Sequence, residues 1–133
     1  MIKQKRPVDC LPVAFQILTG IDLIPEMRET EVWHIQDIQR GAFFHDLTVI
    51  PYERKPKVLK NGEVIYCENF KNIVLSALVR WHRGIIVVEG HALAYSKGNC
   101  YDPATGYQIG IPTLDHIKAF WAIAEIESDS QKK

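Results

Sequence analysis

The sequence has no hydrophobic run that could cross a membrane, because no apolar stretch approaches the roughly 20 residues that a spanning helix needs. Its first ten residues, MIKQKRPVDC, carry no apolar core behind their positive charges and so do not predict a secretory signal peptide. An excess of charge is also missing, since 16 basic residues balance 16 acidic ones. That balance argues against a polyanionic partner such as nucleic acid.

Cysteine is scarce and odd in number, with only Cys10, Cys67 and Cys100. Three cysteines cannot close a disulfide framework, so we expect a reducing compartment and a cytoplasmic protein. No two of them are close in sequence, and no pair of histidines has the spacing of zinc ligands. We therefore expect neither a metal ion nor an organic cofactor.

The composition is that of a globular protein, with 47% hydrophobic and 24% charged residues in a chain of 133. This length corresponds to one ordinary domain that can bury a substantial core. We expect a single domain over residues 1–127 and a polar tail over 128–133. The sequence does not indicate an oligomeric state, and a monomer is assumed.

Helical and strand patterns follow one another along the chain, which predicts an α+β fold with N-terminal helices packed on a C-terminal antiparallel sheet. A hairpin is predicted around Asn61-Gly62, the dipeptide that a type I′ turn favours. Short strands are expected from residue 84 to residue 111, where glycine-rich turns interrupt apolar segments. The predicted helices cover residues 10–19, 30–45, 69–82 and 113–121.

Cys10 stands at the start of the first predicted helix, where Asp9 is the expected N-cap and Gly20 the expected stop. A free cysteine is most often a buried core residue. At a helix N-terminus, however, free N–H groups and the helix dipole favour the thiolate, which is the nucleophilic form. A neighbouring imidazole would complete the activation by forming a thiolate–imidazolium pair.

Of the five histidines, His91 is the best candidate for that imidazole. Four lie on or beside predicted helices or at their ends, whereas His91 opens the strand GHALAYS after a glycine that leaves room for a substrate. Asp102, in the next strand CYDPATG, is the candidate partner that orients the ring. If Lys97-Gly98 form the turn, Asp102 lies diagonal to His91 on the same face, whereas a Gly98-Asn99 turn moves it roughly 13 Å along the strand. Local propensity slightly prefers the second turn.

An oxyanion formed at Cys10 would need hydrogen-bond donors. The Cys10 N–H can supply one, and the side-chain amide of Gln4 can supply another if the chain turns back before the helix. Together, Q-x5-C opening a helix, GH opening a strand and then YDPATG resemble the papain-like cysteine peptidases, and most closely the small bacteriocin-leader-processing type. The resemblance covers Gln4 to about Trp121.

The resemblance implies that Cys10 is the nucleophile, His91 the general base and acid, Asp102 the residue that orients His91, and Gln4 an oxyanion-hole donor. It implies a thiol protease or amidohydrolase that acts on a protein or peptide through a thioester. Leu11 departs from the pattern, because these peptidases usually have glycine after the cysteine.

Three other interpretations stay open. The same triad can transfer an acyl group or deamidate glutamine, because the shape and chemistry of the cleft determine whether water or an amine accepts the acyl group. A second alternative is a papain-like binding module without turnover, which is suggested by Leu11 in the position where these peptidases usually have glycine. The third is a structural α+β protein in which the Cys, His and Asp are incidental.

Overall fold

The protein's structure is a computed structural model that describes residues 9–25, 33–53, 56–66 and 70–126. Within these residues the fold is α+β, with a six-stranded antiparallel sheet and a separate two-stranded hairpin. The helices are α1 (Cys10–Thr19), α2 (Ile35–Phe44) and α3 (Phe70–Arg80). The strands are β1 (Leu47–Glu53), β2 (Pro56–Val58), β3 (Val64–Tyr66), β4 (Arg83–Val88), β5 (His91–Ser96), β6 (Asn99–Tyr101), β7 (Gln108–Ile109) and β8 (Ala119–Glu125).

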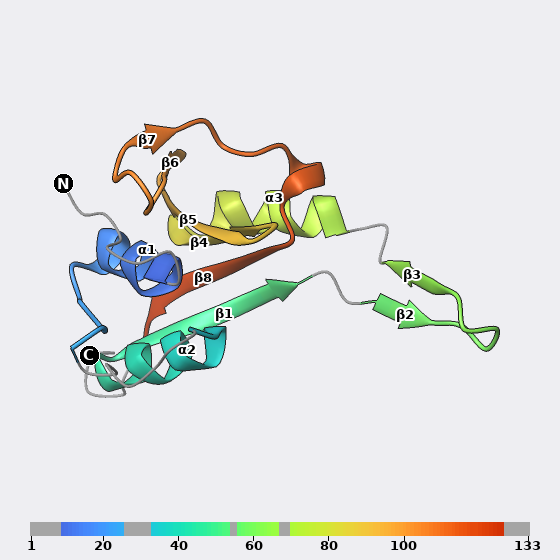
Figure 1. Cartoon of the computed structure of the whole chain (residues 1–133), viewed down its shortest axis with the longest axis horizontal. Helices are drawn as coiled ribbons and strands as arrows, with labels where there is room; N and C mark the ends of the chain where they lie inside the picture. The colour runs from blue at the N-terminus through green and yellow to red at the C-terminus, as the bar shows by residue number, and fades with distance from the viewer. Residues whose placement is uncertain (1–8, 26–32, 54–55, 67–69, 127–133) are drawn as a thin grey trace, which may run out of the picture.

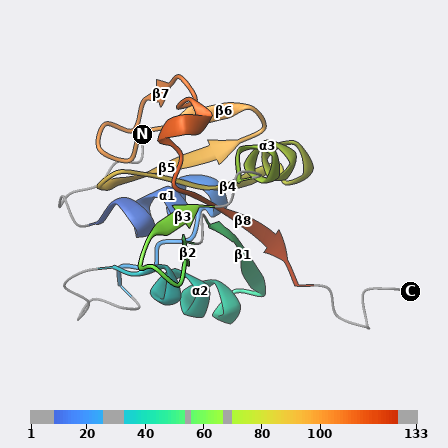
Figure 2. The same cartoon turned by 90° about the vertical axis from the view of Figure 1, so that its right-hand side faces the viewer.

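The six-stranded sheet has the order β1-β8-β4-β5-β6-β7 and lies between two layers of helix. Helices α1 and α2 cover one face and α3 covers the other (Figure 2). The hairpin of β2 and β3 extends away from this body (Figure 1). The sheet is thus the central layer of three.

Each face of the sheet carries its own apolar core, because neighbouring residues of a strand point to opposite faces. In β4, Ile85 packs toward α1 and α2, whereas Ile86 packs toward α3. In β8, Trp121 likewise packs toward α1 and α2, and Phe120 packs toward α3. Burial on both faces explains why these central strands are almost continuously apolar in sequence.

Helix α1 begins and ends at the predicted residues. Pro12 is accommodated in the first turn, and Gly20 ends the helix in the left-handed region, with φ 78° and its N–H bonded to the Gln16 carbonyl at 2.8 Å. Phe15, from the apolar face, is fully buried. Asp9 occupies the N-cap position, but its side chain makes no capping hydrogen bond.

The predicted helix over 113–121 is wrong. A short 3₁₀ turn (Leu114–His116) is followed by β8, which lies between β1 and β4 in the sheet. The segment AFWAIAE is apolar at almost every position, so its periodicity does not separate a buried helix from a buried strand. Hydrogen bonding to β1 on one side and to β4 on the other stabilises this segment as a strand.

The second predicted helix is shorter than expected within the described residues, since α2 begins at Ile35 and residues 30–32 lie outside them. A capping box starts it, with the Asp37 carboxylate accepting the His34 N–H at 2.9 Å. Strand β1, which follows, was not predicted as a strand. Pro51 lies within it and is tolerated because β1 is an edge strand. The third predicted helix is present as α3.

The predicted hairpin is present, but its turn differs. The Leu59 N–H bonds to the Glu63 carbonyl at 2.8 Å, which leaves the three residues 60–62 as the loop, and the Gly62 N–H bonds to the Leu59 carbonyl at 2.9 Å. Gly62 has φ 86° and is the only residue of the loop with positive φ. This is the arrangement of a turn closed by a left-handed glycine, not the two-residue type I′ turn.

Gly84 in β4 is required by close packing. A β-carbon at this position would meet the Phe120 ring and approach the Trp121 carbonyl oxygen to 2.8 Å. Gly84→Ala is therefore expected to lower the free energy of unfolding by about 1–3 kcal/mol, the range of an overpacked core. Denaturant titration measures the loss. Gly110→Ala is the matched control, because nothing lies within 4 Å of its added carbon, and an equal loss in both variants would contradict the argument.

No helix among the described residues is long and apolar enough to cross a membrane.

Candidate active site

The turn between β5 and β6 decides where Asp102 lies. Ser96 pairs with Asn99 and Ala94 with Tyr101, so Lys97 and Gly98 are the two turn residues. Both have positive φ, 49° and 84°, as a type I′ turn requires. This is the register that the triad needs, and it is the one that local propensity did not prefer.

His91 and Asp102 consequently meet across the strands. His91 Nε2 lies 2.6 Å from Asp102 Oδ1, and the two side chains are 27% and 24% exposed. The same carboxylate oxygen accepts the Ala104 N–H at 2.9 Å, which is the Asx turn that an Asp-Pro sequence favours. The imidazole is therefore held at one nitrogen. Its other nitrogen, Nδ1, makes no hydrogen bond to any described residue.

The pKa of the Asp102 carboxyl reflects this bonding. Partial burial alone would raise the pKa, but the hydrogen bond from His91, the Ala104 N–H and the charge of His91 together lower it below its ordinary value. A carboxylate that stays ionised can fix the tautomer of the imidazole and stabilise its protonated form.

Cys10 lies beside the first residues of β5. Helix α1 packs on this strand, and the backbone of Ala92, the residue after His91, is near enough to the thiol to lower its pKa. Cys10 is half-buried against the core that α1 shares with the sheet. The structure thus brings His91 to Asp102 and Cys10 to the backbone of Ala92, but among the described residues it shows no contact between the Cys10 thiol and the His91 ring.

The expectation of a thiol with a lowered pKa is wrong. Burial raises the pKa of Cys10, and this outweighs the lowering by hydrogen bonds with the backbone of Ala92, Leu11 and Cys10 itself. The negative charge of Asp9, which is 2% exposed, raises it further. The backbone at the start of the helix therefore lowers the pKa of the thiol as predicted, but desolvation raises this pKa by more.

The first turn of α1 nevertheless supplies donors to the sulfur. Because the Asp9 side chain makes no capping hydrogen bond, it does not occupy the N–H groups that open the helix. The backbone N–H groups of Leu11 and Cys10 lower the pKa of the thiol. These donors lie where negative charge develops when the sulfur loses its proton or its adduct forms an oxyanion.

Gln4, the predicted second oxyanion donor, lies outside the described residues, as does Cys67. Leu11 is half-buried and packs against the core on the α1 side of the sheet. Cys100 is fully buried on the opposite face, and burial, with the charge of Asp102, raises the pKa of its thiol to about 11. Cys100 is a core residue.

Two contributors were not predicted, namely the backbone N–H groups of Ala92 and Ala104. Neither has a side chain that could signal a role. The only cue was position, directly after His91 in one case and two residues after Asp102 in the other.

Within the described residues no group of three or more His, Cys, Asp or Glu side chains could hold a metal ion. Comparison of the chain with protein-family models, with curated proteins and with solved structures gave no match.

The raised pKa of Cys10 has a measurable consequence. The thiolate is the form that iodoacetamide alkylates, so the alkylation rate of Cys10 in a Cys67→Ala background should keep rising beyond pH 9.0, the ordinary thiol value. Mass spectrometry of the labelled peptide gives the rate at each pH. The buried Cys100 serves as an internal control that labels only after denaturation. A rate that is already constant between pH 6 and pH 7 would show a preformed thiolate and contradict this assignment.

Proposed function

We propose that the protein is a cysteine hydrolase that cleaves an amide or peptide bond, with Cys10 as nucleophile, His91 as general base and acid, and Asp102 as the residue that orients His91. The observation that carries this proposal is the 2.6 Å contact between His91 and Asp102 on β5 and β6, with helix α1, which begins at Cys10, packed on β5. A helix that begins with the cysteine and packs on an antiparallel sheet also suits a papain-like fold.

The raised thiol pKa favours general-base activation over a preformed ion pair. In the first step His91 Nδ1 takes the proton from the thiol while the sulfur attacks the carbonyl carbon. The N–H groups at the start of α1 stabilise the resulting oxyanion, and Gln4 is the proposed second donor. Asp102 stabilises the imidazolium that has formed.

The intermediate then collapses. The carbon–nitrogen bond breaks, the proton on His91 passes to the leaving amine, and the acyl group stays on Cys10 as a thioester. Water, deprotonated by His91, attacks this thioester and releases the acid and the free thiol. If an amine replaces water as acceptor, the same steps give acyl transfer.

Acylation of Cys10 by an activated ester tests the proposal without knowledge of the substrate. Mixed with p-nitrophenyl acetate, the protein should release a burst of one equivalent of nitrophenolate at neutral pH and carry one acetyl group on the Cys10 peptide. Hydroxylamine should remove the group, as it does from a thioester. Absence of both burst and adduct would refute the hydrolase. A primary amine added in the same assay distinguishes transfer from hydrolysis by the product it forms.

A binding module without turnover is the second candidate, and the raised pKa of Cys10 favours it. A thiol that stays protonated, with Leu11 where the resembling peptidases have glycine, suits a retained scaffold. In that case a captured peptide would bind Cys10→Ala as tightly as the parent, and no acyl adduct would form. The thioester experiment separates the two candidates.

A further inference from the structure

A cavity of about 550 Å³ lies at the other end of β5 from His91. It is formed where α3 ends, β4 begins and β5 turns into β6, and Arg80, Trp81, Arg83 and Lys97 line it. The cavity is open to solvent on one side, so a ligand would be held mainly by the side chains that line it. Ser96, which lines the cavity, lies five residues after His91 in β5. Because a strand rises about 3.4 Å per residue, the two residues are roughly 17 Å apart. The cavity is thus separate from the candidate active site.

The charges around the cavity are mostly positive. Arg80, Arg83 and Lys97 contribute three cations, against the single carboxylate of Glu125. None of the three forms an ion pair with a carboxylate among the described residues. Arg83 donates one hydrogen bond to the Leu18 carbonyl at 3.3 Å, which leaves most of its five N–H donors available.

The fold holds these cations together. The Lys97 N–H bonds to the His82 carbonyl at 2.6 Å and so ties the β5–β6 turn to the segment between α3 and β4. The Arg80 guanidinium lies over the Trp81 ring, 5.2 Å from its centroid. The Trp81 ring is itself fixed by a hydrogen bond from Nε1 to the Tyr52 hydroxyl at 2.6 Å.

Lys97 is an unfavourable residue for its own backbone conformation. Its φ of 49° lies in the left-handed region, where glycine and asparagine are the residues that a type I′ turn prefers. Lysine gains nothing there from packing, because its side chain is exposed. Residues in strained conformations concentrate at functional sites, and this lysine is one of the residues that line the cavity.

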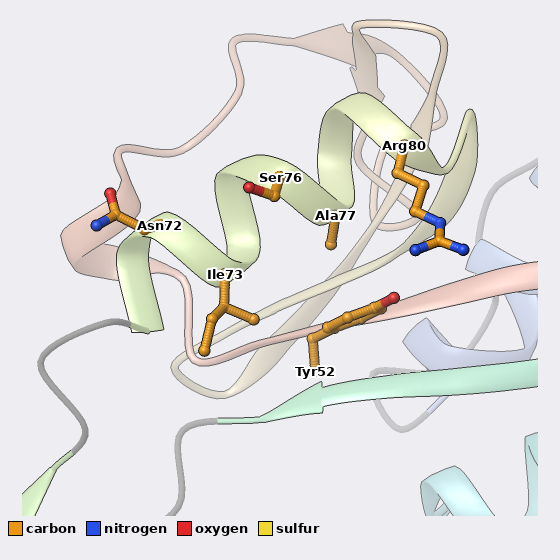
Figure 3. A pocket seen from close by; sticks show the side chains of 6 residues that line it. All are labelled: Tyr52, Asn72, Ile73, Ser76, Ala77 and Arg80. Atoms are coloured by element: carbon orange, nitrogen blue, oxygen red, sulfur yellow. The ribbon is translucent and has the colours of Figure 1, made fainter.

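An apolar surface lies next to the charged one. Arg80 also lines a smaller cavity of about 320 Å³ together with Tyr52, Ile73 and Ala77. Figure 3 shows the Arg80 guanidinium and the Tyr52 hydroxyl on the same side of α3, with Ile73 and Ala77 nearby. A ligand held at its anionic end by the cations can place a ring or short apolar group toward Trp81 or this groove.

We propose that this cavity, lined by Arg80, Arg83 and Lys97 beside Trp81, is a binding site for a small organic oxyanion, either a phosphate monoester or an ionised carboxylic acid, that carries an apolar or aromatic group. Guanidinium and ammonium groups bind such anions through charge-assisted hydrogen bonds. No bond is made or broken in this step, and the site does not depend on the hydrolase proposed above.

Phenyl phosphate is a suitable probe, with binding followed by calorimetry and by the fluorescence of Trp81. The full chain should bind it with a dissociation constant of about 1 mM or tighter. Lys97→Asn should weaken binding about tenfold, because one charge-assisted contact is lost. The same variant should melt no lower than the parent, since asparagine suits the left-handed backbone better. Arg80→Gln should weaken binding in the same direction.

Lys60→Asn is the matched control, because it removes an equal charge from an exposed position in the β2–β3 loop. It should leave the affinity unchanged. The proposal is overturned if phenyl phosphate does not bind in the millimolar range, if Lys97→Asn binds as the parent does, or if Lys60→Asn weakens binding equally. Binding that persists in Cys10→Ala, together with loss in Lys97→Asn, shows that this site is independent of the thiol chemistry.

Discussion

Replacing Cys10 with alanine is expected to remove the nitrophenolate burst completely and to lower ester turnover by about 10⁴-fold or more. The reason is that the thiol forms the covalent bond with the acyl group, and no neighbouring side chain can take its place. Ala92, the residue whose backbone contacts the sulfur, offers only a backbone group, and His91 without the thiol can at best activate water. The rate of nitrophenolate release, parent against variant, measures the effect.

The control for this prediction is Cys100→Ala. Cys100 is fully buried on the other face of the sheet, so its removal should leave the burst and the turnover unchanged although it creates a cavity and costs stability. Cys10→Ala should have the opposite profile, with lost chemistry and little lost stability, since Cys10 is only half-buried. A burst that survives in Cys10→Ala would place the nucleophile elsewhere and end the proposal.

The placement of Asp102 shows how far local sequence rules reach in this protein. Propensity slightly prefers Gly98-Asn99 as the turn residues, because glycine suits the first position of a type II′ turn. The structure instead places Lys97 at that position, in a conformation that lysine adopts at a cost. The observed pairing places Asp102 opposite Leu93, whereas a Gly98-Asn99 turn would shift β6 by two residues, keep its side chains on the same faces and move Asp102 away from His91 along the strand. The register of this hairpin therefore decides the contact between His91 and Asp102.

The elements that were predicted correctly carry local signals. Helix α1 has proline in its first turn and a glycine stop, and α3 has apolar residues at helical spacing. The strand β8 has no such signal, because its apolar residues serve both cores and follow no period. The prediction of a lowered pKa for the Cys10 thiol was wrong for a related reason. Position in a helix can be inferred from sequence, whereas the desolvation that outweighs it depends on what packs against the sulfur.

Asp102→Asn is expected to lower the rate constant for acylation by roughly 10²–10⁴-fold while leaving the Michaelis constant nearly unchanged. Asparagine can keep a hydrogen bond to His91 Nε2, but it cannot balance the positive charge that His91 gains when it takes the thiol proton. It also permits the ring to adopt the tautomer that leaves Nδ1 protonated and unable to act as base. Burst kinetics with p-nitrophenyl acetate give the rate constant. Asp22→Asn, which changes an exposed carboxylate outside the site, should leave it unaltered.

The stability of the same variant should depend on pH in a defined direction. The folded state lowers the pKa of Asp102 below its ordinary value of 3.8, so the ionised carboxylate stabilises the fold above that pH, and the contribution disappears as the pH falls through the lowered value. The parent should therefore exceed Asp102→Asn in free energy of unfolding at neutral pH, and the difference should shrink in strong acid. A difference that stays constant from pH 7 to pH 2, together with an unchanged acylation rate, would show that the contact between His91 and Asp102 is only a structural hydrogen bond.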